Sequence, residues 1–212
     1  DLYVPASQWK LVGIPVSGEV VGDIDDNLAT NTVGGVNKIG LGYWNTTSSS
    51  WTVLAATATG DGLSQTRGYE MIHSSGDVVR FTGNLRADSR STVGTLSNRW
   101  TLLGNPFPSY LRLTDDASGA SGSNYFLNST HVGYLKNTHQ AVYGWDGTAY
   151  DTYSNDTGPH DRLMPGDGFF VYGTDEDSFT FTESMQVHDG GAGFRGSAVQ
   201  GATDDSENRS AS

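Results

Sequence analysis

A short apolar motif occurs twice in the chain and limits the fold more than any other feature. "WKLVGIPVS" begins at Trp9, and "WTLLGNPFPS" begins at Trp100, 91 residues later. In the first copy Trp9, Leu11 and Gly13 alternate with Lys10, Val12 and Ile14, and the second copy follows the same pattern. Each copy has a glycine at its fifth position and a proline at its seventh. A period of two indicates a half-buried strand, and a proline ends its hydrogen-bonded ladder. The motif therefore predicts one type of strand built twice.

Three further blocks repeat in the same order. The pairs are "GYWNTTSSSW" (42–51) with "YGWDGTAY" (143–150), "LSQTRGYEMI" (63–72) with "LMPGDGFFVY" (163–172), and "DVVRFT" (77–82) with "DSFTFT" (177–182), at offsets of 101, 100 and 100 residues. A chance likeness does not keep its order and spacing through four blocks. We therefore predict two internally duplicated halves, residues 1–90 and 91–188, in a pseudo-twofold relation.

The distribution of residue types indicates an all-β fold. Short runs of Val, Leu, Tyr, Phe and Trp are separated by turns rich in Gly, Asp and Ser, and no long segment has apolar residues at helical spacing. Neither half has enough strands to close a core easily alone. We expect one β-sandwich, or two tightly packed half-sandwiches. Residues 189–212 lose the pattern and are expected to be a polar tail or a linker.

Charge and cysteine content exclude several classes of partner and site. The 24 acidic and 12 basic residues give a net charge of -12, which repels phosphate backbones and anionic lipid surfaces. Nucleic-acid binding and membrane insertion are therefore not expected, and no apolar run reaches membrane-spanning length. The absence of cysteine excludes disulfides and thiolate metal sites.

Four segments of the second half resemble a known module. They are "WTLLGNPFPS" (100–109), "YGWD" (143–146), "PGDGFFV" (165–171) and "FTFTESMQVH" (179–188). The set resembles a β module of secreted and cell-surface proteins of the Bacteroidetes, where it commonly precedes the sorting signal of type IX secretion. The likeness implies an extracellular or cell-surface location beside adhesins or polysaccharide-degrading enzymes. The chain departs from the pattern at 184–188, which lacks the basic residue before His188, and no sorting domain follows. We therefore expect a piece of a longer protein or an unusual member.

Aromatic residues near the predicted hairpins are candidates for ligand binding. Pyranose rings stack on aromatic side chains because their CH groups favour a π face. The candidate contacts are Trp44, Trp51, Trp145, Tyr150 and Tyr153. The alternative is that these rings are duplicated core. A core position is what we expect for Trp9, Trp100, Phe169 and Phe181.

Oxygen-rich turns offer a possible calcium site, the one cofactor that the sequence suggests. Asp23, Asp25, Asp26 and Asn27 have the spacing that begins a calcium loop, but the later Gly and the distal Glu are missing. Residues 114–124 and 151–161 are similarly rich in oxygen ligands, and solvated turns are the alternative for all three segments. The five histidines form no zinc motif, and no nucleophile elbow or phosphate-binding loop occurs.

These features favour a non-catalytic, extracellular β-sandwich module for adhesion or glycan binding within a larger protein. Its expected partners are a polysaccharide or surface glycan, other copies of itself, or neighbouring domains. The alternative is a structural subunit of a cell-surface filament or sheath that assembles through edge strands or its C-terminal tail. A polysaccharide lyase or hydrolase is the least favoured interpretation, because no catalytic residues are predicted.

Overall fold

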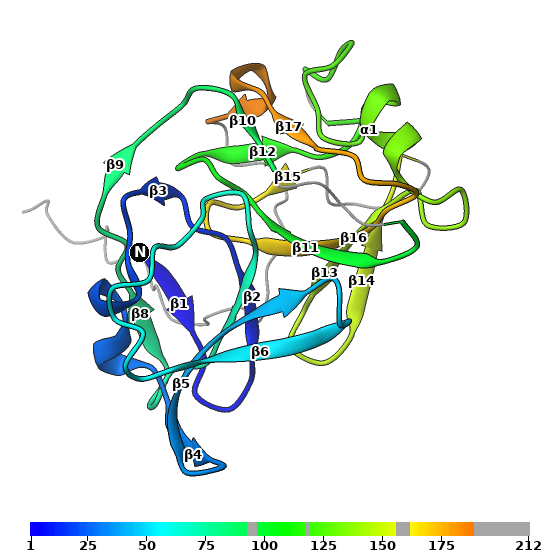
Figure 1. The fold of residues 1–212 in the computed structure, drawn as a ribbon. Helices are drawn as coiled ribbons and strands as arrows, with labels where there is room; N and C mark the ends of the chain where they lie inside the picture. The colour runs from blue at the N-terminus through cyan, green and yellow to red at the C-terminus, as the bar shows by residue number, and fades with distance from the viewer. Residues whose placement is uncertain (93–96, 118, 156–161, 189–212) are drawn as a thin grey trace, which may run out of the picture.

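The computed structural model describes residues 1–92, 97–117, 119–155 and 162–188. It confirms the all-β prediction, with 42% strand, 8% helix and several antiparallel sheets (Figure 1). The predicted polar tail, residues 189–212, lies outside the described residues. Within the described part, none of the helices has the length and apolar character needed to cross a bilayer.

Two larger sheets form the centre of the molecule. The first contains β2 (Lys10–Val12), β7 (Tyr69–Met71), β5 (Val36–Asn45) and β6 (Ser50–Ala55), with β4 (Thr30–Val33) also paired to β5. The second contains β11 (Trp100–Gly104), β16 (Gly168–Tyr172), β13 (Val142–Trp145) and β14 (Tyr150–Tyr153). Both are built from antiparallel pairs, so each hairpin places its two strands side by side.

The two sheets have the same strand order and the same register. The order β2-β7-β5-β6 corresponds to β11-β16-β13-β14. Leu11 lies opposite Glu70 in the first sheet, and Leu102 lies opposite Phe170 in the second. These pairs fall at the offsets that the repeated blocks predict. Descent from one duplicated unit stays a prediction, which the matched register supports.

Smaller elements surround the two sheets. The paired strands are β1 (Leu2–Val4) with β8 (Asp77–Val79), β3 (Val16–Ser17) with β9 (Asn84–Leu85), β10 (Arg90–Ser91) with β17 (Thr180–Phe181), and β12 (Tyr110–Arg112) with both β15 (Arg162–Leu163) and β18 (Gln186–Val187). The helices are α1 (Ser129–Tyr134) and the 3-10 turns η1 (Val21–Asp23), η2 (Asp25–Asn27) and η3 (Glu183–Met185). Helix α1 begins at Asn128, whose side chain accepts hydrogen bonds from two backbone amides of the first turn.

Each half has its own hydrophobic core. The core of the first half is formed by residues between Leu2 and Val79, and that of the second half by residues between Leu103 and Met185. Phe169 and Phe181 are fully buried in the second core, as expected from the sequence. The arrangement is therefore nearer to two packed half-sandwiches than to one shared interior.

The backbones of the two halves come close together at a pair of glycines. A Cβ atom on Gly13 would lie 2.8 Å from the backbone nitrogen of Asn105, and one on Gly104 would lie 2.6 Å from the Cα atom of Gly13. Glycine has no Cβ, so the two backbones can come this close. The amide of Gly13 donates to the carbonyl of Gly166 at 2.9 Å, and that of Gly104 donates to the carbonyl of Thr66 at 3.1 Å. The contacts between the halves are therefore reciprocal.

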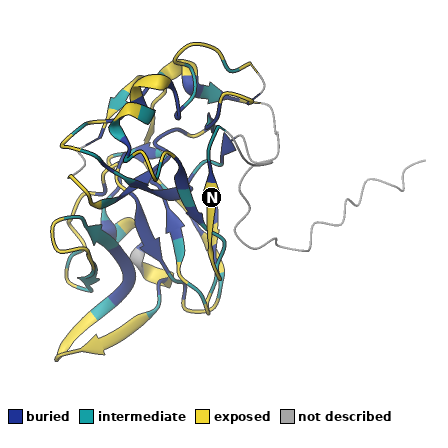
Figure 2. Cartoon of the chain, turned by 90° about the vertical axis from the view of Figure 1, so that its right-hand side faces the viewer, coloured by how far each residue is buried: buried dark blue, intermediate teal, exposed yellow. Residues whose placement is uncertain are grey.

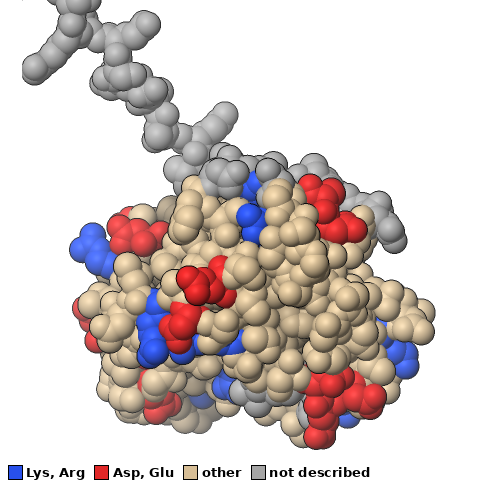
Figure 3. All heavy atoms as spheres, turned by 90° about the horizontal axis from the view of Figure 1, so that it is seen from above, with Lys and Arg blue, Asp and Glu red and all other residues tan. Residues whose placement is uncertain are grey.

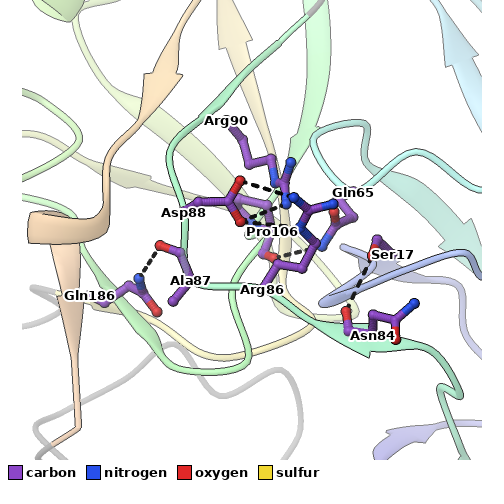
Figure 4. A network of polar contacts seen from close by, with 9 residues as sticks. All are labelled: Ser17, Gln65, Asn84, Arg86, Ala87, Asp88, Arg90, Pro106 and Gln186. Atoms are coloured by element: carbon purple, nitrogen blue, oxygen red, sulfur yellow. Dashed lines mark hydrogen bonds and ion pairs between the residues drawn. The ribbon is translucent and has the colours of Figure 1, made fainter.

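The chain that crosses from the first half to the second is held by polar contacts (Figure 4). Gln186 donates from Nε2 to the carbonyl of Ala87 at 2.9 Å, and Gln65 donates from Nε2 to the carbonyl of Pro106 at 3.3 Å. Asp88 accepts hydrogen bonds from the two arginines that flank it. Solvent screens exposed ion pairs of this kind, so they contribute little to the stability of the fold.

The surface is mostly uncharged on the face drawn in Figure 3, where acidic and basic side chains form small separate groups. Figure 2 shows that burial is concentrated in the sheets, while the hairpin of β4 and β5 and the outer side of α1 are exposed. Every residue of β4 is exposed. This hairpin therefore extends beyond the core into solvent.

Candidate functional site

All five tryptophans of the chain gather where the two sheets meet. A small buried cluster of Leu11, Leu102 and Phe170 joins the sheets. The aromatic residues around it are only partly buried. We define the aromatic face as Trp9, Trp44, Trp51, Trp100, Tyr143, Trp145, Tyr150 and Phe170.

Cross-strand pairing places these rings in matched positions. Trp44 lies opposite Trp51 in the β5–β6 hairpin, with ring centroids 5.4 Å apart. Trp145 lies opposite Tyr150 in the β13–β14 hairpin, with centroids 4.9 Å apart. Directly opposite side chains share one face of a sheet and contact each other. The Asp146–Gly147 turn of this hairpin therefore brings Trp145 and Tyr150 side by side.

Phe170 is the central ring of the aromatic face. Its centroid lies 5.5 Å from that of Trp44, 6.0 Å from that of Trp51, 6.3 Å from that of Trp100 and 5.9 Å from that of Tyr150. All four contacts are edge-to-face, an arrangement that aromatic quadrupoles favour. Phe170 therefore holds rings from both sheets in fixed orientations.

Two indole groups are anchored across the junction by hydrogen bonds. Trp44 donates from Nε1 to the carbonyl of Trp100 at 2.9 Å, and Trp145 donates from Nε1 to the carbonyl of Trp9 at 3.1 Å. Each bond satisfies the one polar group of its indole. The rings are thus held in place before any ligand arrives.

Two adjoining clefts open on the aromatic face. The Phe170 cleft holds about 480 Å³ and is lined by Trp44, Trp100, Thr138, His139, Tyr143, Tyr150 and Phe170. The Glu70 cleft holds about 340 Å³ and its lining includes Gln8, Trp9, Trp51, Glu70, Trp145 and Tyr150. Tyr150 lines both clefts, so they meet at its ring. Both volumes fall within the range of small-molecule sites, roughly 300–1,000 Å³.

Glu70 is an acidic group in a largely aromatic setting. Its side chain is 7% exposed, and no described residue forms a hydrogen bond with its carboxyl group. Burial raises the pKa of Glu70 to about 7. Burial also raises the pKa of Tyr150, and the charge of Glu70 adds to that effect. Glu70 was not among the predicted site residues, although it stands in the repeated block where the second copy has Phe170.

The structure brings together most of the predicted ligand-binding residues. Trp44, Trp51, Trp145 and Tyr150 all belong to the aromatic face, and Tyr150 is 52% exposed. Tyr153 does not, because it is 3% exposed and packs in the core of the second half. Its hydroxyl donates to the carboxylate of Asp151 at 3.2 Å. The prediction of an exposed contact at Tyr153 is therefore wrong.

Trp9 and Trp100 are not core residues, contrary to expectation. Trp9 is 36% exposed, and Trp100 is partly buried at the edge of the Phe170 cleft. Trp9 immediately precedes β2 and Trp100 begins β11, and the junction of the sheets covers both rings incompletely. Their exposure adds two rings to the candidate binding surface.

The possible calcium site at Asp23, Asp25, Asp26 and Asn27 stays a prediction, because one of its four side chains is not described. Among residues with a described placement, no three His, Asp or Glu side chains converge as metal ligands would. The carboxylate of Asp23 accepts a hydrogen bond from the backbone amide of Val20 at 3.3 Å, a contact that Asp side chains commonly make in turns. The side chain of Asp25, and residues 156–161 of the third oxygen-rich segment, lie outside the described part.

Comparison of the chain with protein-family models, with curated proteins and with solved structures gives no match. The likeness to the Bacteroidetes module, and the extracellular location that it implies, therefore stay predictions.

Proposed function

We propose that the aromatic face binds carbohydrate and that the protein is a non-catalytic extracellular module for adhesion or glycan binding. The observation that carries this proposal is the partial exposure of five tryptophans at one junction, with two of them anchored by hydrogen bonds. Soluble proteins rarely leave a contiguous apolar surface open without a partner. Rigid aromatic rings lose little conformational entropy on binding, and the CH faces of sugars stack on them.

Polar groups at the rims of the clefts suit sugar hydroxyls. Gln8 and Ser7 line the Glu70 cleft, and Thr138 and His139 line the Phe170 cleft. A largely apolar lining with a few polar groups is typical of sites in which hydrogen bonds fix the orientation of a ligand. Because Tyr150 borders both clefts, an oligosaccharide can contact them together.

Affinity electrophoresis on a panel of polysaccharides tests this function. We expect retardation of the wild-type protein on at least one polysaccharide, and its loss in Trp51→Ala and Tyr150→Ala. Removing a stacked ring leaves a site that has lost its main apolar contact. Tyr125→Ala is the matched control, because Tyr125 is a partly buried aromatic residue outside both clefts. The proposal fails if no polysaccharide retards the protein.

The second proposed function, a structural subunit of a filament or sheath, rests on the β4–β5 hairpin. Strand β4 is fully exposed and pairs only with β5 among the described strands. Val33 and Val36 are exposed on either side of the Gly34–Gly35 turn. An uncovered edge strand offers free backbone groups to another chain. Light scattering tests this, since assembly that is lost in Val33→Lys supports it and a monomer at every concentration contradicts it.

A further inference from the structure

The two clefts differ in the chemistry of one matched position. Glu70 lies opposite Leu11, and Phe170 lies opposite Leu102, in the same register of the two sheets. In one cleft the position holds a phenyl ring that packs against four aromatic neighbours. In the other it holds a carboxyl group. The two copies therefore differ in whether this position can carry a charge.

The carboxyl group of Glu70 borders an open cleft and has no hydrogen-bond partner among the described residues. Its side chain is 7% exposed, it makes no hydrogen bond with any described residue, and it lines the Glu70 cleft. Its Oε1 atom lies 2.8 Å from the place where a Cβ atom of Gly42 would be, so the absence of a side chain at Gly42 makes room for it. The carboxyl oxygens are not sealed from the cleft, so a ligand bound there can reach them in place of water.

The surroundings of Glu70 suit a cation. Aromatic rings of Trp9, Trp51, Trp145 and Tyr150 line the same cleft, and their π faces attract positive charge within about 6 Å. No lysine or arginine is among the described residues that line it. Lys10 is next to Leu11 in β2, but successive side chains of a strand point to opposite faces, and the charge that acts on Lys10 is that of Asp167. The negative charge of Glu70 is thus left for a ligand to neutralise.

We propose that the Glu70 cleft binds the ammonium group of an amino sugar, so that the glycans recognised by this protein carry free amines. This inference rests on the proposed carbohydrate-binding function and names the class of sugar. The ammonium group donates charge-assisted hydrogen bonds to the carboxylate while the sugar ring stacks on the neighbouring rings. The net charge of -12 attracts cationic glycans over longer distances. A neutral or N-acetylated sugar can donate a hydrogen bond to the carboxylate but brings no positive charge to neutralise it.

Calorimetry at pH 6.5 and low ionic strength tests the inference with three matched oligomers: of glucosamine, of N-acetylglucosamine and of glucose. We expect the wild-type protein to bind the glucosamine oligomer about tenfold more tightly than either of the others, because only its ammonium group brings a positive charge to the carboxylate. Glu70→Gln is expected to remove this preference while keeping the shape of the side chain. Glu176→Gln is the control, since Glu176 is exposed and lies outside the cleft, and it is expected to keep the preference.

The outcomes separate this inference from the function on which it rests. Equal affinity for the three oligomers, or a preference that survives in Glu70→Gln, overturns the amino-sugar inference and leaves carbohydrate binding in place. Binding of trilysine as tight as that of the glucosamine oligomer, and equally dependent on Glu70, overturns the assignment to a sugar. Absence of binding to every oligomer overturns both proposals.

Discussion

The indole nitrogen of Trp44 donates a hydrogen bond to the carbonyl oxygen of Trp100 at 2.9 Å, across the junction of the two sheets. Its counterpart is the bond from Trp145 to the carbonyl of Trp9 at 3.1 Å. Each half of the chain thus donates one indole hydrogen bond to a backbone carbonyl of the other half. The aromatic face is therefore part of the junction as well as the candidate binding surface, and substitutions there can change stability and binding together.

The Trp44 bond has a measurable effect on stability. Trp44→Phe keeps an aromatic ring but removes the donor and leaves the carbonyl of Trp100 unpaired. We expect the free energy of unfolding to fall by about 1–2 kcal/mol, as measured by urea denaturation. Trp51→Phe is the control, because no described residue accepts a hydrogen bond from the Trp51 indole. Equal losses in the two variants would show that the hydrogen bond is not the cause.

The contact between Gly13 and Gly104 leaves no space for side chains. In Gly104→Ala the new Cβ atom would lie 2.6 Å from the Cα atom of Gly13 and 3.0 Å from the carbonyl oxygen of Arg67, and backbone atoms yield poorly. We expect a loss of about 3 kcal/mol or more in the free energy of unfolding. Gly60→Ala is the control, since nothing lies within 4 Å of its Cβ position. Similar unfolding midpoints for the two variants would contradict this close approach.

Stability falls with rising pH because of Glu19. This residue is 1% exposed, its Oε2 accepts a hydrogen bond from the amide of Thr82 at 2.7 Å, and its Oε1 has no described partner. Burial raises its pKa from 4.5 to about 7, and the negative charge of Asp23 adds a smaller upward effect. The folded protein therefore binds a proton more tightly than the unfolded chain. The stabilisation is complete below pH 4.5 and is lost as pH rises through 7.

In Glu19→Gln the free energy of unfolding is expected to decline by about 3 kcal/mol less between low and high pH than in the wild type. This value follows from the raised pKa of Glu19, since one pKa unit corresponds to about 1.4 kcal/mol. Urea denaturation at pH 5 and pH 8 measures it, and the variant should be the more stable protein at pH 8. The stability of the variant still falls with rising pH, but less steeply, because burial also raises the pKa values of Glu70 and Asp167 to about 7. An unchanged slope in Glu19→Gln would contradict the assignment.

Ligand binding is expected to have its own pH dependence. A trimethylated glucosamine oligomer carries a fixed charge, so only the protein titrates between pH 6 and pH 8. Its cation favours ionised Glu70, whose pKa is about 7, so the affinity should rise about tenfold over this range. Tyr150 is the other titratable group among the described residues lining the cleft, and its raised pKa keeps it neutral throughout. In Glu70→Gln the affinity should not change with pH.

The strands and the hairpin turn could be predicted from the sequence because they depend on local alternation and on the repeated blocks. The face that each side chain occupies could not always be predicted. Tyr150 and Tyr153 are both in β14, but three positions apart in a strand means opposite faces, so one is exposed and the other is core. That rule was available from the sequence, and it would have excluded Tyr153.

The role of β2 depends on packing that no local pattern reveals. Its Leu11 and Val12 are both buried, because one packs at the junction of the sheets and the other in the core of the first half. Because β2 is covered on both sides, the prediction of a half-buried strand is wrong, and so is the core position that it implied for Trp9. Glu70 was missed for the same reason, since its burial depends on rings from β6, β13 and β14.

The difference between Glu70 and Phe170 has a consequence for any polymer that spans both clefts. Only two clefts with identical linings could hold such a chain equally well in either direction. A carboxyl group at one end and a phenyl ring at the other make the two orientations unequal, so the chain would be held with its reducing end on one defined side.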